Sequence, residues 1–198
     1  MERVPLPTFV EFVFTAGKPR IQVAKTFKDH RYDHLADFYK PLREAIIDTH
    51  AGGKPLSALD DFLRMLTDER KRRVFPGLVE AYRKWFHASP KRWIAPPRSM
   101  LPIGDLEIDI APPLGFEIDG RPTFIYLHFS GATLAQKRVD VLLGFVSAAL
   151  GPVMPTTQFG LLDVGRSKLH TLRHPSNPRL GLLARGEAAS FATIYAAV

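Results

Sequence analysis

The sequence contains no cysteine in its 198 residues. This absence excludes disulfide bonds, thiolate metal sites and cysteine nucleophiles, and it is typical of a reducing compartment, so we expect a cytoplasmic protein. The sequence also lacks any apolar run of about 18 residues, the length that a membrane-spanning helix requires, so no membrane partner is expected. The first residues carry an acid early and lack a long apolar core with a cleavage site, so we expect no signal peptide.

Acidic residues are too few to balance the basic ones. The chain has 27 Lys and Arg against 20 Asp and Glu, which gives a formal net charge of +7 and an isoelectric point near 9.8. This excess favours an acidic partner such as nucleic acid. Hydrophobic residues make up 45% of the chain, an ordinary share for a packed protein, so the composition predicts a folded chain rather than a disordered one.

The length predicts a single domain over residues 1–198. We expect its first half, 1–100, to hold one or more N-terminal strands and several helices. The second half, 101–198, is expected to form a core of sheet and helix.

Positive charge is concentrated between residues 70 and 98. This stretch holds nine basic residues and one acid, Glu80, so its balance of +8 accounts for the whole net charge. Cations neutralise phosphates and exposed aromatic rings stack on bases, so the stretch is a candidate nucleic-acid surface. The residues assigned to this surface are Arg70, Lys71, Arg72, Arg73, Arg83, Lys84, Lys91, Arg92 and Trp93.

A second interpretation of the same stretch is a solvated helix face above a core of aromatic residues. Phe75, Tyr82 and Phe86 recur at helical spacing, which predicts that their rings are buried. Basic stretches are often no more than solvated surface. Trp93 lies in a proline-rich segment, 89–102, where it either stacks on a base or fills the space between the helices and the sheet.

The first half of the chain is predicted to begin with a β-hairpin. Residues 8–16 form an apolar, aromatic-rich run and residues 20–27 alternate in part, so we expect two strands joined across Gly17-Lys18-Pro19. Apolar residues at a spacing of three or four then predict a series of helices. These helices cover 32–50 with a kink or break at Pro41, 57–66 with a Ser57/Asp60 capping pattern, a segment capped by Thr67, and a segment from Pro76 to His87.

The second half of the chain changes to a period of two. Residues 105–111 alternate apolar and acidic side chains. Residues 114–119 and 123–129 flank Asp119-Gly120, a dipeptide typical of hairpin turns. We expect these three segments to be adjacent antiparallel strands.

A helix and two further strands are predicted after this hairpin. A Thr133/Gln136 capping box predicts a helix over 133–150 that packs across one face of the three strands. The nearly continuous apolar run at 159–164 is typical of a buried central strand. A strand over 168–172 and a C-terminal helix from Leu180 complete the prediction.

Over residues 76–172 the predicted order is therefore helix, three strands, helix, strand. This order, with the hairpin at its centre, resembles the core of the PD-(D/E)XK nuclease-like superfamily. The resemblance implies an α/β (α+β) fold in which helices flank a central mixed sheet. It also implies an acid on the second core strand, often after a proline, and an acid and a lysine two residues apart on the third. Alternate strand residues share a face, so such side chains would hold Mg²⁺ and a nucleophilic water together.

The motif positions of this chain hold none of these residues. The proline-acid position falls on Pro112-Pro113, and the acid-x-lysine position falls on Tyr126-Leu127-His128. No acid or lysine occurs between Gly120 and Gln136, so a small shift in register does not restore the motif on the third strand. The resemblance therefore implies a degenerate member without a catalytic site, and we expect no metal or cofactor.

Three functions are compatible with the sequence. We favour a non-catalytic nucleic-acid-binding protein that belongs to a DNA- or RNA-processing or defence assembly. The first alternative is a metal-dependent nuclease that holds Mg²⁺ with displaced acids, for which Glu80, Asp109 and Glu117 are the candidates. The second alternative is a protein-interaction module that uses segment 89–102 and the apolar C-terminal helix. The sequence leaves the oligomeric state and the choice between DNA and RNA open.

Overall fold

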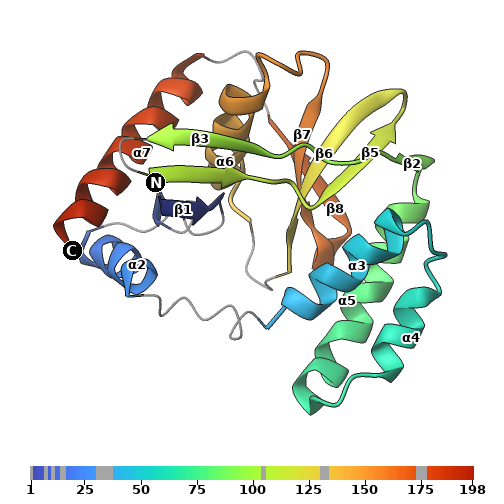
Figure 1. Ribbon diagram of the computed structural model, residues 1–198. Coiled ribbons are helices and arrows are strands. Elements are labelled where there is room, and N and C mark those ends of the chain that lie inside the picture. The colour runs from blue at the N-terminus through green and yellow to red at the C-terminus, as the bar shows by residue number, and fades with distance from the viewer. Residues whose placement is uncertain are drawn as a thin grey trace.

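A five-stranded mixed sheet forms the centre of the computed structural model, which describes residues 2–6, 9, 12–13, 17–29, 38–103, 106–129, 134–172 and 178–198 (Figure 1). The strands lie in the order β2-β5-β6-β7-β8. Neighbouring strands are antiparallel except β6 and β7, which are parallel. The predicted α+β class with a central mixed sheet and flanking helices is confirmed. The strands are β2 (Lys91–Trp93), β5 (Leu114–Ile118), β6 (Arg121–His128), β7 (Gln158–Asp163) and β8 (Lys168–Thr171).

The predicted hairpin at the centre of the sheet is confirmed. Ile118 pairs with Arg121 across a two-residue turn, and the pairing continues to Leu114 and Ile125. Both turn residues have positive φ, 52° at Asp119 and 73° at Gly120. Asp and Gly tolerate this left-handed conformation, which matches the right-handed twist of the flanking strands.

A second, three-stranded sheet lies beside the first. Its order is β1-β4-β3, with β1 (Glu2–Pro5) parallel to β4 (Leu106–Ile110) and β3 (Ser99–Ile103) antiparallel to β4. The strand predicted over 105–111 is therefore present, but its predicted pairing with 114–119 is wrong. Pro112-Pro113 lie one residue after the end of β4, and proline has no amide hydrogen to donate to a strand ladder, so the chain leaves this sheet before β5 begins.

Helices cover both faces of the five-stranded sheet (Figure 1). Along β6, Phe124 and Tyr126 belong to the core shared with α6 (Gln136–Leu150) and α7 (Pro178–Ala197). Ile125 belongs to a separate core shared with α3, α4 and α5. Alternate residues of a strand point to opposite faces, so this strand contributes to both cores. The bounds of the last three helices are Lys40–Ala51, Ala58–Arg64 and Glu69–His87.

The hairpin predicted over 8–16 and 20–27 is wrong, because residues 18–28 form a helix. This helix, α2 (Lys18–Lys28), has Pro19 in its first turn and packs on α7, where the Phe27 ring lies 6.0 Å from that of Tyr195. Of 8–16, the described residues 9, 12 and 13 are helical, and the others lie outside the described residues. The Phe12 ring contacts Phe191 of α7 edge-on at 4.8 Å, so packing against a helix decides the local structure.

The two helices predicted from Thr67 and Pro76 form one helix, α5. Its N-terminal cap is Asp68, whose carboxylate accepts a hydrogen bond from the Lys71 amide at 3.0 Å. Pro76 lies inside the helix, where the missing amide hydrogen costs about 3 kcal/mol. The buried residues on either side of it, Phe75 and Val79, offset this cost through the apolar surface that they remove from water.

The helix α3 begins at Lys40, one residue before Pro41, and residues 38 and 39 form a turn, which is compatible with the break predicted at Pro41; residues 32–37 of the predicted helix lie outside the described residues. Two other local predictions need correction. Ser57 precedes α4 but makes no side-chain capping hydrogen bond. Gln136 is the first residue of α6 rather than its third, and Thr133 lies outside the described residues. The end of α6 at Leu150, the strands β7 and β8 and the C-terminal helix agree with the sequence.

Candidate nucleic-acid interface

The candidate surface is built on α5. The side of this helix that faces the sheet carries the aromatic residues that the sequence predicts to be core. Phe75 and Tyr82 are fully buried and Phe86 packs against the same cluster, so this prediction is confirmed. The opposite side carries the charge.

Three cations share the outward side of α5. Arg70, Arg73 and Lys84 are exposed, and steps of three and eleven residues bring them to one side of the helix. At 1.5 Å per residue, Arg70 and Lys84 lie about 21 Å apart along the axis. Glu80 is an exposed acid between them. Within the described part of the chain, neither Arg73 nor Lys84 has an ion-pair partner, so this face presents net positive charge.

The first turn of α5 also carries cations that contact neighbouring groups. The guanidinium of Arg70 lies 4.8 Å from the centre of the Phe38 ring, and the ammonium of Lys71 lies 5.9 Å from it. Arg72 donates a hydrogen bond from Nε to the Leu66 carbonyl at 2.5 Å. These contacts fix where the cations lie, and Arg70 and Arg72 are still exposed to solvent.

Three of the predicted surface residues contact neighbouring groups of the protein, and two of them form ion pairs. Arg83 donates to the Leu56 carbonyl at 3.0 Å and forms an ion pair of 2.8 Å with Asp60, which ties α5 to α4. Arg92 forms an ion pair of 2.6 Å with Glu117 across β2 and β5. The Arg83 side chain is mostly buried, whereas the Arg92 side chain is 70% exposed, so its ion pair contributes little to stability and leaves it on the surface.

The third of these residues, Lys91, closes the C-terminal end of α5. Its Nζ donates to the carbonyls of Trp85, Phe86 and Ser89 at 2.9 to 3.0 Å, and it lies 4.7 Å from the centre of the Trp85 ring. A cation at this position adds a hydrogen-bond donor to carbonyls at the end of the helix and interacts favourably with the helix dipole. Burial lowers the pKa of Lys91.

Trp93 fills the space between the helices and the sheet. Its ring stacks on His50 at 5.9 Å with an interplanar angle of 13°, and meets Phe116 of β5 edge-on at 5.5 Å. His50 is buried and its Nε2 lies 2.7 Å from the Tyr82 hydroxyl, so the two side chains share a hydrogen bond. Burial lowers the pKa of His50 from 6.5 to about 4, so the ring is neutral at pH 7. Of the two interpretations of Trp93, the structure therefore supports the packing one.

A cavity of about 550 Å³ lies beside the outward face of α5. Val74, Gly77 and Leu78 of α5 line one side of it. Tyr39, before α3, and Phe129, after β6, line another, and their rings stack 5.4 Å apart at 15°. In open α/β sheets, ligands bind outside the carboxyl ends of the strands, and this cavity lies past the ends of the parallel pair β6 and β7.

The remaining wall of the cavity is the short 3₁₀ helix η1 (Val164–Arg166), directly after β7. Arg166 forms an ion pair of 2.9 Å with Asp163, and its backbone amide also donates to this carboxylate. Asp163 is 1% exposed, whereas the Arg166 side chain is 43% exposed. This arginine was not predicted from the sequence. An acid and a Gly-Arg pair at the end of a buried parallel strand are the signal that would have found it.

Tyr126 and His128, at the positions that the resemblance assigns to the third strand of the motif, lie on the opposite, α6 side of the sheet. Tyr126 is buried there and its pKa is raised by burial. His128 is the register partner of Asp163 in the neighbouring strand. Burial also lowers the pKa of His170, on β8.

The displaced acids lie on three different elements. Glu80 is exposed on α5. Asp109, on β4, is bound through both oxygens by Arg98, at 3.0 and 2.6 Å. Glu117 is on β5, in the other sheet, where Arg92 binds it. In the ranges that the structure describes, no three His, Asp or Glu side chains are grouped to hold a metal ion.

No family model matches this chain, and no curated protein matches it either. None of the described helices is both long and apolar enough to cross a membrane.

Proposed function

We propose that this protein binds nucleic acid through the outward face of α5 and does not cleave it. The observation that carries the proposal is the set of exposed cations on that face, Arg70, Arg73 and Lys84, with Glu80 as the acid beside them. Such a face attracts phosphates and releases their counterions. Phosphate contacts fix the position of the protein without reading the sequence of bases.

The order of elements supports a nuclease-like origin for this core. In the five-stranded sheet, α5 is followed by β2, β5, β6, α6 and β7, with β6 and β7 parallel. The strand over 105–111, which the sequence prediction counted as the first core strand, is β4 and lies in the other sheet. With β2 in its place, the five-stranded sheet has the order helix, three strands, helix, strand that resembles the PD-(D/E)XK core, and the β3–β4 hairpin stands between β2 and β5. Tyr126 and His128 occupy the acid and lysine positions, which supports a non-catalytic role within a larger DNA- or RNA-processing or defence assembly.

The arrangement of the acids disfavours the nuclease alternative. Asp109 and Glu117 belong to different sheets, and each is neutralised by an arginine. A Mg²⁺ site needs several oxygen ligands around one point, so Mg²⁺ would have to displace both arginines and bring the acids together.

The test of nucleic-acid binding is a fluorescence anisotropy titration at several salt concentrations, with labelled single-stranded and duplex DNA and RNA. Affinity is expected to fall with salt, with a log–log slope of about −0.9 for each duplex phosphate contacted. Arg73→Ala combined with Lys84→Ala should weaken binding and flatten the slope by about one unit for each phosphate that the variant no longer neutralises. Arg185→Ala, an exposed cation on α7, is the matched control and should change neither value. Absence of binding to any of these probes at low salt would refute the proposal.

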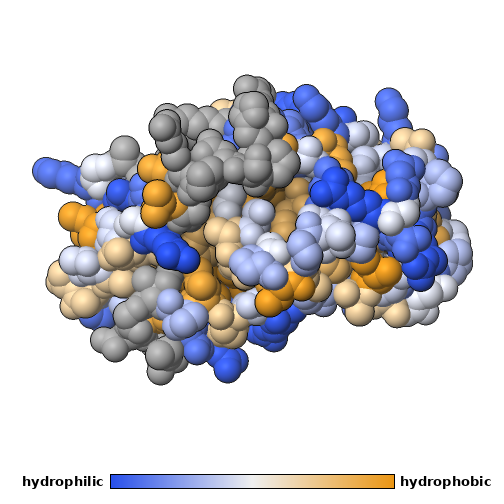
Figure 2. Space-filling model, turned by 90° about the horizontal axis from the view of Figure 1, so that it is seen from above, coloured by the Kyte–Doolittle hydropathy of each residue, from blue (hydrophilic) through white to orange (hydrophobic). Residues whose placement is uncertain are grey.

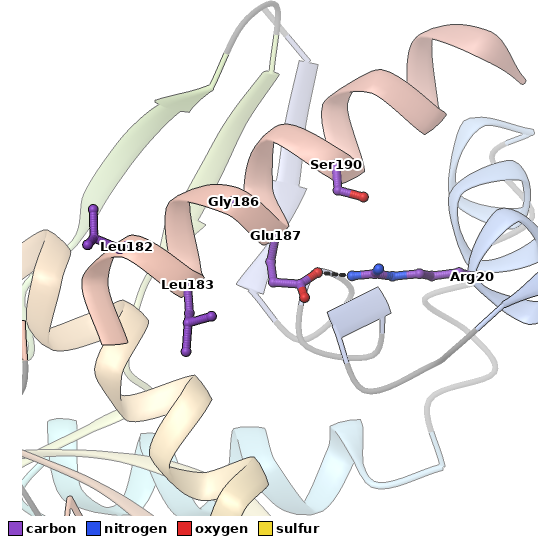
Figure 3. A pocket seen from close by; sticks show the side chains of 6 residues that line it. All are labelled: Arg20, Leu182, Leu183, Gly186, Glu187 and Ser190. Atoms are coloured by element: carbon purple, nitrogen blue, oxygen red, sulfur yellow. Dashed lines mark hydrogen bonds and ion pairs between the residues drawn. The ribbon is translucent and has the colours of Figure 1, made fainter. Parts of the chain in front are cut away.

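A second candidate function, binding of a protein partner, is favoured by α7. Leu182 and Leu183 are 68% and 59% exposed, and they line a cavity of about 520 Å³ that extends toward Arg20 of α2. Figure 3 shows Arg20 directed at Glu187, with which it forms an ion pair at the other side of this cavity. Among the coloured residues on the face that Figure 2 shows, hydrophilic side chains interrupt the apolar ones, so these residues form no single wide apolar patch of the kind that marks large interfaces.

A further inference from the structure

The cavity beside α5 has a volume of about 550 Å³ and is lined by aromatic, apolar and charged residues. We propose that it takes a single unstacked nucleotide of a bound strand, so that the protein prefers single-stranded over duplex nucleic acid. This inference rests on the proposed function, because the strand reaches the cavity through the cations of α5. Its volume of about 550 Å³ lies in the range of small-molecule sites.

Glycines keep the cavity open. A Cβ atom built on Gly77 would meet nothing within 4 Å, and one built on Gly165 would meet its nearest neighbour, Leu78, at 3.8 Å. Gly77 lies in the middle of a 19-residue helix, where glycine is less favourable than alanine by about 1 kcal/mol. Glycine at position 77 therefore destabilises the helix, but its lack of a side chain leaves space in the cavity.

An aromatic platform lines the cavity. Phe129 is 5% exposed, and Tyr39 stacks on it and on Phe75, whose centroid lies 6.4 Å away at an angle of 28°. Tyr39 is half-buried and lines the cavity, so a base that enters meets the part of this residue that Phe129 and Phe75 leave exposed. Every base has an aromatic face, so a stacking platform of this kind binds bases with little regard to sequence.

An anchored arginine provides the charge. The Arg166 guanidinium is held through Nη1 by the buried Asp163 carboxylate, at 2.9 Å. Arginine has five N–H donors in a fixed planar fork, and one that is already positioned loses less freedom when it binds a phosphate. The combination of an apolar, aromatic-lined space with a fixed guanidinium at its edge is suited to a base and the phosphate attached to it.

The cations of α5 lie next to this cavity, where they would bind the phosphates of a nucleic-acid strand. Arg70 is one helical turn before Val74, and Arg73 is one turn before Gly77, so the rim of the cavity on the α5 side is positive. A base in an intact duplex is paired and stacked, and it would have to flip out to enter. A single strand does so at much lower cost, which is the physical source of the preference.

The experiment fills the cavity without changing charge. The probe is a fluorescein-labelled oligothymidylate of about twelve nucleotides, compared with a duplex of equal length by anisotropy. The wild-type protein should bind the single strand about tenfold more tightly than the duplex, as expected for one stacked base. Gly77→Leu should reduce single-strand affinity about tenfold and leave duplex affinity and the salt slope unchanged, because the phosphate contacts on α5 remain.

Gly77→Ala is the matched control. Its methyl group has no neighbour within 4 Å, and it should change neither affinity. Both substitutions raise helix propensity, so thermal melting should show that both variants are folded. Single-strand binding that survives Gly77→Leu, or an equal loss for single strand and duplex, would overturn this inference and leave the proposed function standing. No binding to either probe by the wild-type protein would overturn both.

Discussion

Replacing Trp93 by alanine is expected to destabilise the fold and to leave nucleic-acid binding unchanged. The indole stacks on His50 at 5.9 Å and meets Phe116 edge-on at 5.5 Å, between the helices and β5. Complete removal of a buried Trp side chain costs about 3–5 kcal/mol. Trp93 is half-buried, so we expect about half of this cost, roughly 2 kcal/mol. For a chain of this length the melting temperature should fall by about 4–8 °C.

The assay combines thermal melting, followed by circular dichroism, with anisotropy titrations at a temperature where the variant is folded. Trp93→Phe is the control: it keeps a ring against His50 and should recover most of the lost stability. The opposite outcome would be an unchanged melting temperature with single-strand affinity reduced by about 1–3 kcal/mol, the value expected for loss of a stacked base. That result would show that Trp93 binds nucleic acid and that its contacts with His50 contribute little.

Three further predictions concern stability and metal. Gly115→Ala should lower the free energy of unfolding by about 2 kcal/mol in urea denaturation, because the new methyl group would collide with the Ile94 carbonyl oxygen. The free energy of unfolding should fall by up to about 3 kcal/mol as the pH is lowered from 6.5 to 4. In this range the unfolded chain protonates His50, whereas the folded protein, in which the pKa of His50 is lowered to about 4, does not. His50→Gln should flatten this part of the pH profile, and an unchanged profile would contradict the assignment. Calorimetric titration with Mg²⁺ or Mn²⁺ should reveal no site of micromolar strength, whereas a stoichiometric site abolished by Asp109→Ala or Glu117→Ala would revive the nuclease hypothesis.

Local signals in the sequence predicted much of the central sheet. Asp119-Gly120 defines the β5–β6 hairpin because few residues adopt positive φ at both turn positions. The apolar run at 159–164 is confirmed as part of β7, whose residues are nearly all buried. Both predictions depend on properties of the segments themselves.

Pairing between distant segments could not be predicted in the same way. The strand over 105–111 has the expected pattern, but nothing in that pattern distinguishes β5 from β3 or β1 as its neighbour. Residues 20–27 alternate in part and yet form a helix, because α7 provides an apolar surface for α2 to pack on. Tertiary contacts override local preference in both cases.

In the candidate surface, too, the residue types could be predicted from the sequence and their contacts could not. The sequence identifies the cations of residues 70–98, but not which of them already have partners. Arg83 and Lys91 look like Arg73 and Lys84 in the sequence, and only the structure shows that Asp60 and three main-chain carbonyls occupy the first two. The cavity with Arg166 joins segments more than a hundred residues apart, so periodicity gives no indication of it.

The parallel pairing of β1 with β4 has a consequence for how the chain folds as it is synthesised. Glu2 pairs with Leu106, so about a hundred residues must leave the ribosome before β1 meets its neighbour. Until then β1 has no ladder to join, whereas α3, α4 and α5 are already complete. We therefore expect the helices over 40–87 to form early and the three-stranded sheet to close late. Any delay in that closure would leave the edge of β4, with its buried Leu106 and Ile108, available to the β4 of another unfinished chain.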